Sequence, residues 1–373
     1  MELNRIRFNN RLNADFVKEL RLAVDQYFTS RNISPYANTA MVIKTICMVS
    51  LYVVPYILIM TGNFGAWASL GFALLMGLGA TGIGFSVAHD ALHNAYSKNP
   101  LVNKLIGVSF NFLGANDYFW KIKHNVRHHT YTNIYEKDED IDAPVNILRL
   151  TPQVKWKPVH RIQPWVALPL YSLLSLSWVF YTDFNKLLTY NGNGSPNPDV
   201  KHPVKEVVRL FAYKLVYIFL TIALPMMVLP FAWWQILIGF VAMHMLMGII
   251  LSVVFQLAHI VEETEFPAPT EKGDIENSFV VHQFNTTANF AVRNPVITWF
   301  VGGLNFQVEH HLFPHICSIH YYKLSRVVEA KAREFGITYH NHHSLISAIR
   351  SHFRTLQNFS RPDSYQVPAN AAA

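Results

Sequence analysis

The chain has 373 residues, of which 51 % are hydrophobic and 15 % are charged, and its mean hydropathy is +0.16. Soluble domains usually carry about 25 % charged residues, so this composition argues against a soluble protein and predicts an integral membrane protein with a sizeable aqueous part. The formal net charge of +7 would suit a nucleic-acid-binding protein, but no nucleic-acid-binding motif accompanies it, and we exclude nucleic acid as a partner.

The first 38 residues are polar and lack the apolar core of a cleaved secretory signal. Four apolar residues at helical spacing predict a short amphipathic helix within them: Phe16, Leu20, Val24 and Phe28. We expect three units along the chain, namely a cytoplasmic N-terminal segment, a single domain and a tail, at 1–38, 39–368 and 369–373.

Four apolar runs are each near the ~20 residues that a transmembrane helix needs. They cover about 39–60, 64–88, 207–230 and 231–258. The second run is rich in glycine, and small residues let membrane helices approach one another closely. The sequence therefore predicts four membrane spans.

Basic residues are distributed unevenly around these spans. Of the 31 lysines and arginines, six lie in 1–38, 13 in 89–206 and nine in 259–373, whereas the short turns near Gly62 and Pro230 contain none. Cytoplasmic loops carry an excess of lysine and arginine, so we expect both termini and the 89–206 region on the cytoplasmic side. Three basic residues within spans are expected to extend toward the interface: Lys44, Arg209 and Lys214.

Eight of the 18 histidines gather in four places: His89 and His93, then His124, His128 and His129, then His259, and finally His310 and His311. Residues four apart share a face of a helix, so the first two places each offer a pair that can hold a metal ion. Imidazole suits iron, zinc, copper and nickel. One such pair arises easily by chance, but several clusters expected at one membrane face predict a metal centre.

The shared face of these clusters limits the number of crossings. The first cluster follows the second span and the last follows the fourth, so an even number of crossings must separate them. A further apolar run, 164–181, is therefore expected to lie in the interface or to enter the membrane and return, and the same is expected of 295–306. Trp165, Trp178 and Trp299 fit the interfacial preference of tryptophan.

Two spans are followed in order by HDALH, HNVRHH, two further spans and QVEHHLFP. This order resembles the membrane fatty acid desaturase family over nearly the whole chain. The resemblance implies an all-α integral membrane protein, with four transmembrane helices and interfacial helices under a cytoplasmic histidine-rich cap made of 89–206 and 259–368. It also implies two irons and the O2-dependent removal of two hydrogens from an acyl-lipid or acyl-CoA, which leaves a cis double bond and forms water.

The resemblance carries eight iron ligands onto this chain: His89, His93, His124, His128, His129, His259, His310 and His311. Of these, His259 matches a histidine that the family places after its fourth span. The second box departs from the commonest spacing, because three residues rather than two separate its first two histidines.

The third box begins with Gln307, where most of the family has histidine. Such a glutamine is typical of the front-end branch, which desaturates between an existing double bond and the carboxyl end and includes Δ6- and Δ5-desaturases. An amide is a poor iron ligand beside imidazole. Gln307 therefore either binds an iron weakly or through water, or it hydrogen-bonds a ligand imidazole.

Many front-end members also carry a cytochrome b5 domain with a His-Pro-Gly-Gly heme motif. Here His202 and Pro203 are followed by Val204 and Lys205, so that motif is absent from the sequence. We therefore expect a separate electron donor, either a ferredoxin or cytochrome b5.

Several polar residues near the boxes are candidates to support the ligands. Metal-bound histidines usually donate their second nitrogen to a carboxylate or carbonyl. The candidates for this role are Asp90, Asn133, Asp138, Asp140, Asp142, Glu262 and Glu263. Asp140 is preferred in the acidic stretch, although a solvated acidic loop is an alternative for 136–142. Three basic residues either hold a phosphate, dock an acidic electron donor or follow the positive-inside bias: Lys121, Lys123 and Arg127. Four residues before the third box either line the site or cap a helix: Gln283, Thr286, Thr287 and Asn289.

Two other functions compete with desaturation. A hydroxylase, acetylenase or ketolase of the same fold would carry the same histidine boxes, and only its products would differ. A metal transporter would need ionisable ligands in the middle of the membrane, where His244 is the only histidine in the predicted spans. A soluble carboxylate di-iron bundle is excluded because no Glu-x-x-His pair exists in the sequence.

Overall fold

The computed structural model describes residues 6–141, 147–195 and 199–362, and Asp142 and the expected tail at 369–373 lie outside them. The described chain is mostly helical, as expected for an all-α membrane protein. Its strands form only two parallel pairs of two residues each. They are β1 (Arg7–Phe8) with β2 (Asp274–Ile275), and β3 (Asn289–Phe290) with β4 (Asn341–His342).

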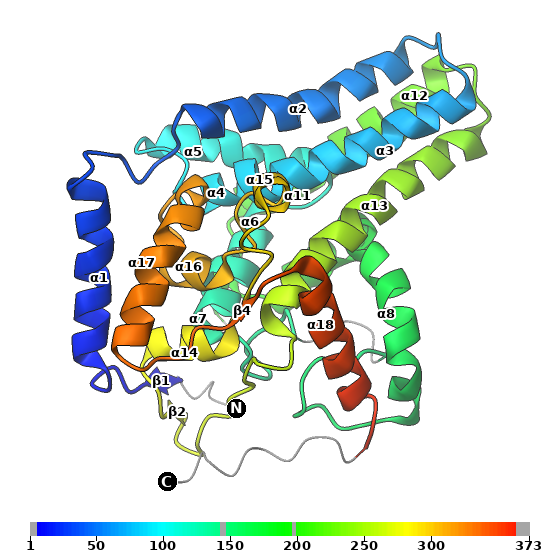
Figure 1. The fold of residues 1–373 in the computed structure, drawn as a ribbon. Helices are drawn as coiled ribbons and strands as arrows, with labels where there is room; N and C mark the ends of the chain where they lie inside the picture. The colour runs from blue at the N-terminus through cyan, green and yellow to red at the C-terminus, as the bar shows by residue number, and fades with distance from the viewer. Residues whose placement is uncertain (1–5, 142–146, 196–198, 363–373) are drawn as a thin grey trace.

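Four helical segments are long and apolar enough to cross a membrane, and they run side by side (Figure 1). The first is α2 (Thr39–Met60), and the last is α13 (Trp233–His259). The second joins α3 (Ala66–Gly82), η1 (Ile83–Ala88) and α4 (His89–Leu92), and the third joins α11 (Val204–Ile218), η7 (Phe219–Ala223) and α12 (Leu224–Val228). The second span therefore extends four residues beyond its predicted end and includes the start of the first histidine box.

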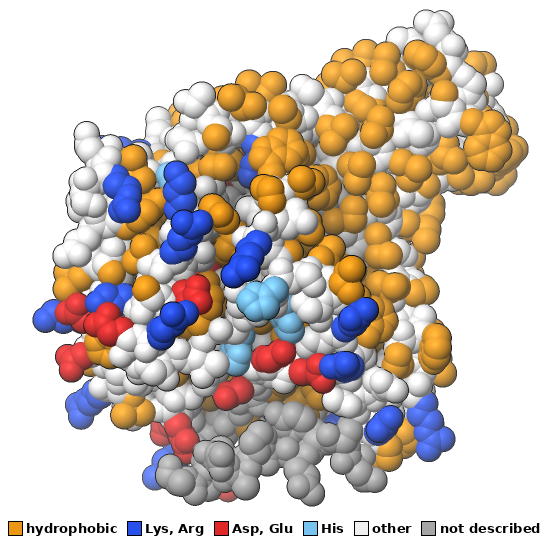
Figure 2. Space-filling model, viewed as in Figure 1, with side chains coloured by type: hydrophobic (Ala, Val, Ile, Leu, Met, Phe, Trp, Pro, Cys, Tyr) orange, Lys and Arg blue, Asp and Glu red, His pale blue; other side chains and the backbone are white. Residues whose placement is uncertain are grey.

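Small residues explain the close packing of α2 on α3. A Cβ placed on Gly79 would lie 2.5 Å from the backbone nitrogen of Tyr52, so only glycine permits this contact. The outward face of α2 exposes large apolar side chains such as Ile43 and Ile46. Figure 2 shows hydrophobic side chains covering the arm formed by the spans, whereas charged side chains gather on the cap. A large apolar surface of this kind marks contact with membrane.

The apolar run at 164–181 forms a bent pair rather than one straight helix. The pair consists of η4 (Pro158–Ile162) with α8 (Gln163–Ser172), followed after a 58° bend by α9 (Leu174–Ser177), η5 (Trp178–Thr182) and α10 (Asp183–Thr189). Arg209, near the start of the third span, forms a 3.0 Å ion pair with Asp117 of the cap. Residues before and after the bent pair are thus in contact, which favours a segment that enters the membrane and returns.

Two of the three basic residues expected to reach the interface are instead buried. Lys214 Nζ lies 2.6 Å from Asp183 and donates to the carbonyls of Gly114 and Trp178. Lys44 is only 2 % exposed. The interior provides Lys214 with a counter-charge, and burying a charge is tolerable only when it is paired in this way.

Short helices build the cap around the histidines. The amphipathic helix α1 (Ala14–Thr29) packs on α17 (Tyr321–Glu334) and buries the predicted stripe of Phe16, Leu20, Val24 and Phe28. The other cap helices are α5 (Pro100–Gly107), η2 (Val108–Leu113), α6 (Asp117–Lys121), η3 (Ile122–His128), α7 (His129–Tyr131), η6 (Gly192–Gly194), α14 (Phe279–Thr286), α15 (Pro295–Phe300), α16 (Gln307–Leu312), η8 (Ser318–His320) and α18 (Leu345–Phe359).

Candidate metal centre

The histidines of all four places meet where the spans enter the cap. The first box lies at the end of the second span, the second box on η3 and α7, the single histidine at the end of α13, and the third box on α16. Because η3 is a π-helix, its turn is one residue wider than an α-helical turn. This wide turn brings His124 and His129, five residues apart, to 3.2 Å between their Nε2 atoms. It also accommodates the extra residue in the second box.

Two groups of imidazoles each bring one nitrogen per residue within 4.8 Å of the others. The first group is His89, His93, His124 and His310, and the second is His128, His259 and His311. His129 lies between the groups, with its ring centroid 4.5 Å from that of His310 and 4.4 Å from that of His311. The structure therefore brings together all eight histidines that the sequence predicted as ligands.

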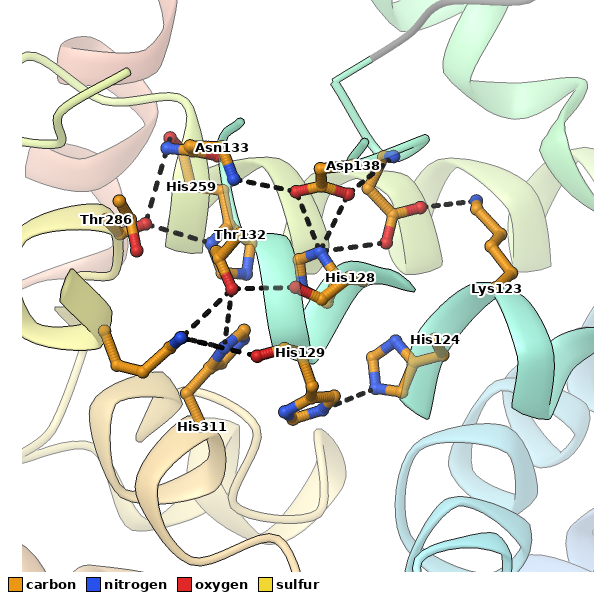
Figure 3. Close-up of polar contacts among 12 residues, drawn as sticks. Lys123, His124, His128, His129, Thr132, Asn133, Asp138, His259, Thr286 and His311 are labelled. Carbon is orange, nitrogen blue, oxygen red and sulfur yellow. Dashed lines mark hydrogen bonds and ion pairs between the residues drawn. The ribbon is translucent and has the colours of Figure 1, made fainter. Parts of the chain in front are cut away.

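The second group shows how its ring nitrogens are used (Figure 3). The Nδ1 atom of His128 lies 3.1 Å from both carboxylate oxygens of Asp138, that of His259 lies 3.2 Å from the Thr286 carbonyl, and that of His311 lies 2.9 Å from Gln283 Oε1. The three Nε2 atoms are buried and have no hydrogen-bond partner among the described residues. Metal-binding histidines show this division, with one nitrogen on a supporting group and the other on the metal.

The first group has the same unused nitrogens. The Nε2 atoms of His89, His93 and His310 are buried and have no hydrogen-bond partner in the described part of the chain. Trp120 stacks on His124 with ring centroids 4.4 Å apart and holds that imidazole from one side. Leaving so many buried nitrogens unpaired would cost free energy in an empty site, so the donor set fits metal ions that prefer imidazole.

Burial keeps most of these imidazoles neutral. Burial first, and then the neighbouring histidines, lowers the pKa of His93, His124, His129, His310 and His311 well below the usual 6.5. A neutral imidazole has a free lone pair, which a metal ligand requires. The lowered pKa values thus agree with the convergent ring nitrogens, since both suit the binding of a metal ion.

In the second box, the pKa of one histidine shifts in the opposite direction. Burial alone would lower the pKa of His128, but the carboxylates of Asp138 and Asp140 raise it above its usual value. Asp138 is buried and makes the shorter contact, whereas Asp140 Oδ2 lies 3.3 Å away and Asp140 also pairs with Lys123. Asp138 is therefore the main support of His128, in a stretch where the sequence favoured Asp140.

The other predicted supporting residues act at a greater distance from the imidazoles. Asn133 Nδ2 donates to the carbonyls of His259 and Glu265 and so fixes the end of α13. Gln307 Nε2 donates to the Leu304 carbonyl at 2.7 Å. Within the described residues, Gln307 makes no hydrogen bond to an imidazole.

Asp90 also turns away from the metal groups. One of its oxygens lies 3.6 Å from His89 Nδ1, beyond hydrogen-bond distance. The other accepts from Cys317 Sγ, the Ser318 backbone nitrogen and Ser318 Oγ. Asp90 therefore ties the first box to the turn that follows the third box.

Gln283 is a functional residue whose role the sequence left open. Its Oε1 accepts from Thr132 Oγ1 and faces His311 Nδ1, while its Nε2 donates to the His129 carbonyl. It thus joins the second and third boxes. The sequence feature that could have indicated this role is its position in the polar motif HQFNTTANF, between the fourth span and the third box. Asp138 had a similar signal, since it lies within the acidic stretch that follows the second box.

Two of the three basic residues that could hold a phosphate or dock an electron donor form ion pairs within the chain. Lys123 pairs with Asp140, and Arg127 Nη1 lies 3.0 Å from Glu139. Glu139 also accepts from Lys186 at 2.7 Å. The cations on this side of the centre are therefore balanced by acidic residues of the segment after the second box.

Known proteins resemble this chain over most of its length. The family model described as fatty acid desaturase matches residues 65–343. The sn-1 linoleoyl-lipid 6-desaturase of Arthrospira platensis is 34 % identical over 350 residues, which cover 92 % of each chain. That of Synechocystis sp. is 33 % identical over 365 residues, or 95 % of this chain and 97 % of the relative.

A moss protein is similar as well. The acyl-lipid (8-3)-desaturase of Physcomitrium patens is 32 % identical over 352 residues, which cover 92 % of this chain and 72 % of the relative. The family match covers both imidazole groups, the second, third and fourth spans and much of the cap. The chain therefore belongs to the fatty acid desaturase family of oxidoreductases.

Proposed function

We propose that this chain is an O2-dependent di-iron desaturase that introduces a cis double bond into the acyl chain of a lipid, with front-end, Δ6-like regiochemistry. The observation that carries the proposal is a pair of adjacent imidazole groups with convergent free Nε2 atoms, beside a cavity whose wall includes His124 and apolar residues of the bent pair. The eight histidines named above would hold the two irons.

The cavity supports an acyl chain as substrate. It has a volume of about 580 Å³, and the bent pair contributes apolar residues such as Leu174 and Trp178 to its lining. Trp120 and Phe255 flank His124 in the same lining. Typical ligand sites combine apolar and aromatic walls with placed polar groups, and this lining also carries charged residues such as Lys186 and Glu139. An acyl chain lying along the apolar part of these walls would pass the first imidazole group.

The residues of this chain position and shield the reaction. Iron, when bound, supplies the O2-dependent oxidising power that an unactivated C–H bond requires and that acid–base groups lack. Asp138, Thr286 and Gln283 fix the orientation of three ligand imidazoles through their Nδ1 atoms. Trp120 and Phe255 exclude water beside His124, and exclusion of water limits side reactions.

The names of the relatives and the third box support the regiochemistry and the carrier. Two relatives at 33–34 % identity are named as linoleoyl-lipid 6-desaturases, and Gln307 starts the third box as in front-end enzymes. We therefore favour an acyl-lipid over acyl-CoA as substrate. Electrons would come from a separate ferredoxin or cytochrome b5.

The basic residues support one orientation in the membrane. Lysine and arginine are concentrated in 89–206, in 259–373 and before the first span. We propose that the centre and both termini face the cytoplasm.

The test is expression of the chain, together with a ferredoxin system, in a bacterial host poor in desaturases. The host would be fed 18-carbon mono- and di-unsaturated acids, and double bonds would be located by mass spectrometry. We expect a new double bond on the carboxyl side of an existing one. His310→Ala should abolish it, whereas His343→Ala, at an exposed histidine outside the centre, should not.

Two results would contradict the proposal. A new hydroxyl group would indicate a hydroxylase of the same fold. Full activity of His310→Ala would remove His310 from the centre. If no product forms, the iron content of the purified protein decides whether the site is built, and fewer than about one iron per chain would count against it.

A further inference from the structure

A second cavity lies at the end of the bundle opposite the histidines. It has a volume of about 260 Å³ and lies among α2, α3, α12 and α13, near the turns at the upper right of Figure 1. Its lining is largely apolar and includes Ala73, Met76, Gly239 and Met243. Because this part of the bundle is expected to be surrounded by membrane, the molecules available to fill the cavity are lipids.

The dimensions of the cavity match one leaflet of a membrane. Its lining on α3 runs from Ala66 to Met76, which is about 15 Å at 1.5 Å per residue. The hydrocarbon core of a bilayer is about 30 Å thick, so the cavity is one leaflet deep. Trp67 and Trp234 are largely exposed at its outer end, where tryptophan marks the membrane interface.

One polar atom in this cavity has no partner. Ser69 lines the cavity and is 9 % exposed, and its Oγ has no hydrogen-bond partner in the described part of the chain. A buried hydroxyl without a partner is unfavourable. Ser69 lies two residues after Trp67 on α3, about 3 Å further along the helix axis, and so near the polar boundary of the leaflet.

The cavity is separate from the one beside His124. The two linings share no residue. His244 follows Met243 of the second cavity, and it is held by Ser175 Oγ at 2.9 Å from its Nδ1 and by Tyr217 Oη at 2.8 Å from its Nε2. Phe240 packs on His244 with ring centroids 4.5 Å apart. Because the lining of the second cavity includes none of the eight histidines, we expect its occupant not to be a substrate.

We propose that this cavity binds one acyl chain of a glycerolipid from the leaflet opposite the histidine centre, and that Ser69 donates a hydrogen bond to its ester carbonyl. The lipid would fill the space between α3 and α13 and complete the packing of the bundle. The proposal needs only the membrane location of the spans and does not depend on the reaction or on the bound metal.

The test uses the full-length protein, freed of lipid in detergent and titrated with dioleoyl-phosphatidylcholine under native mass spectrometry. Gly239→Leu should reduce retention of one lipid at least tenfold, because a Cβ at Gly239 has ordinary contact, 3.8 Å from Ala73 Cβ, and the rest of the side chain enters the cavity. Gly71→Leu is the matched control, since a Cβ at the exposed Gly71 meets nothing within 4 Å.

A second variant tests the hydrogen bond. Ser69→Ala should weaken binding of the ester lipid about fivefold, and the diether analogue, which lacks the carbonyls, should bind wild type and Ser69→Ala equally. Equal retention of the ester lipid by wild type and Gly239→Leu would overturn the site. An equal effect of Ser69→Ala on both lipids would overturn the hydrogen bond. If Gly239→Leu does not fold, titration of the lipid-free wild type decides the site, and failure to retain any phosphatidylcholine would overturn it.

Discussion

The imidazoles of His128, His259 and His311 each use one ring nitrogen for a supporting group and leave the other free. The supporting groups differ in chemistry, since they are a carboxylate, a backbone carbonyl and a side-chain amide. A carboxylate partner makes the imidazole a stronger donor to metal. The support of His128 should therefore matter most to iron affinity.

We expect Asp138→Asn to lower iron affinity and activity by about 10- to 100-fold, the usual effect of losing such a partner. The backbone nitrogens of Asn133 and Asp140 donate at 2.9 Å to different carboxylate oxygens of Asp138. Asparagine therefore keeps an acceptor for only one of them, and its NH2 group faces the other. Asp140→Asn should have a smaller effect because Asp140 is partly exposed and makes the longer contact. Iron content and product formation would be measured for both. Equal losses would show that the two carboxylates share the role.

The histidines also predict how stability depends on pH. Burial first, and then mutual repulsion, lowers the pKa of five imidazoles below the usual 6.5 in the folded state. They are His93, His124, His129, His310 and His311. Their contribution to stability is therefore complete above pH 6.5 and is lost as the pH falls below it, since the unfolded chain then binds more protons.

The metal-free protein should therefore melt at a lower temperature at pH 5.5 than at pH 7.5, and bound iron should reduce this difference. Glu309 acts in the opposite direction, because burial raises its pKa to about 7 and its contribution is lost as the pH rises through that value. Thermal unfolding with and without iron is the measurement. A melting temperature that does not fall on acidification would contradict the five lowered pKa values.

At the scale of elements, close backbone contacts bring the boxes together. Gly302 has φ +66° in the loop before the third box, and a Cβ there would lie 2.6 Å from Ser86 Cβ. Ser86 belongs to η1, which precedes the first box. This contact places the helices of the first and third boxes against each other.

Gly302→Ala should therefore destabilise the protein and reduce its iron content. A left-handed alanine costs about 1–2 kcal/mol by itself, and the contact with Ser86 adds to that cost. Gly336→Ala is the control, because Gly336 has φ +68° but a Cβ there meets nothing within 4 Å. Thermal unfolding should show the larger loss for Gly302→Ala. Equal losses would mean that the contact with Ser86 relaxes freely.

At the scale of the whole molecule, an apolar bundle carries a polar cap, and the metal centre lies where they meet (Figures 1 and 2). The bent pair decides how many times the chain crosses the membrane. The Arg209–Asp117 ion pair and the hydrogen bond between Tyr118 and His202 hold the two ends of this region together. With four crossings, the residues before and after the bent pair lie on the same side of the membrane, as these contacts require.

We expect cysteines at Trp165 and Leu188 to react with a membrane-impermeant maleimide from the same side of the membrane. Both positions are 84 % exposed, and they lie near the two ends of the bent pair. A cysteine at Trp67, which is 87 % exposed in the second span's outer end, should react only from the other side. Cys47 would first be replaced by serine. Labelling of positions 165 and 188 from opposite sides would establish a fifth crossing.

The sequence alone determined the features that depend on local patterns. Hydropathy located four spans within about four residues of the helix ends, because the length of an apolar run is set by the membrane. The stripe of Phe16, Leu20, Val24 and Phe28 predicted a helix with one buried face, and α1 has that face. The histidine boxes contain seven of the eight histidines that meet, because their spacing and chemistry are themselves local, and the family resemblance added His259.

Only the tertiary structure decided which groups support those histidines. Asp138 and Asp140 are two residues apart and chemically alike, and the wide turn of η3 and the fold of the following segment select Asp138 as the closer partner. Gln283 is 28 residues from His311 in sequence, yet it is a hydrogen-bonding partner of His311. The burial of Lys214 likewise depends on Asp183, on another helix. Contacts between distant segments are set by packing, which no local pattern of residues encodes.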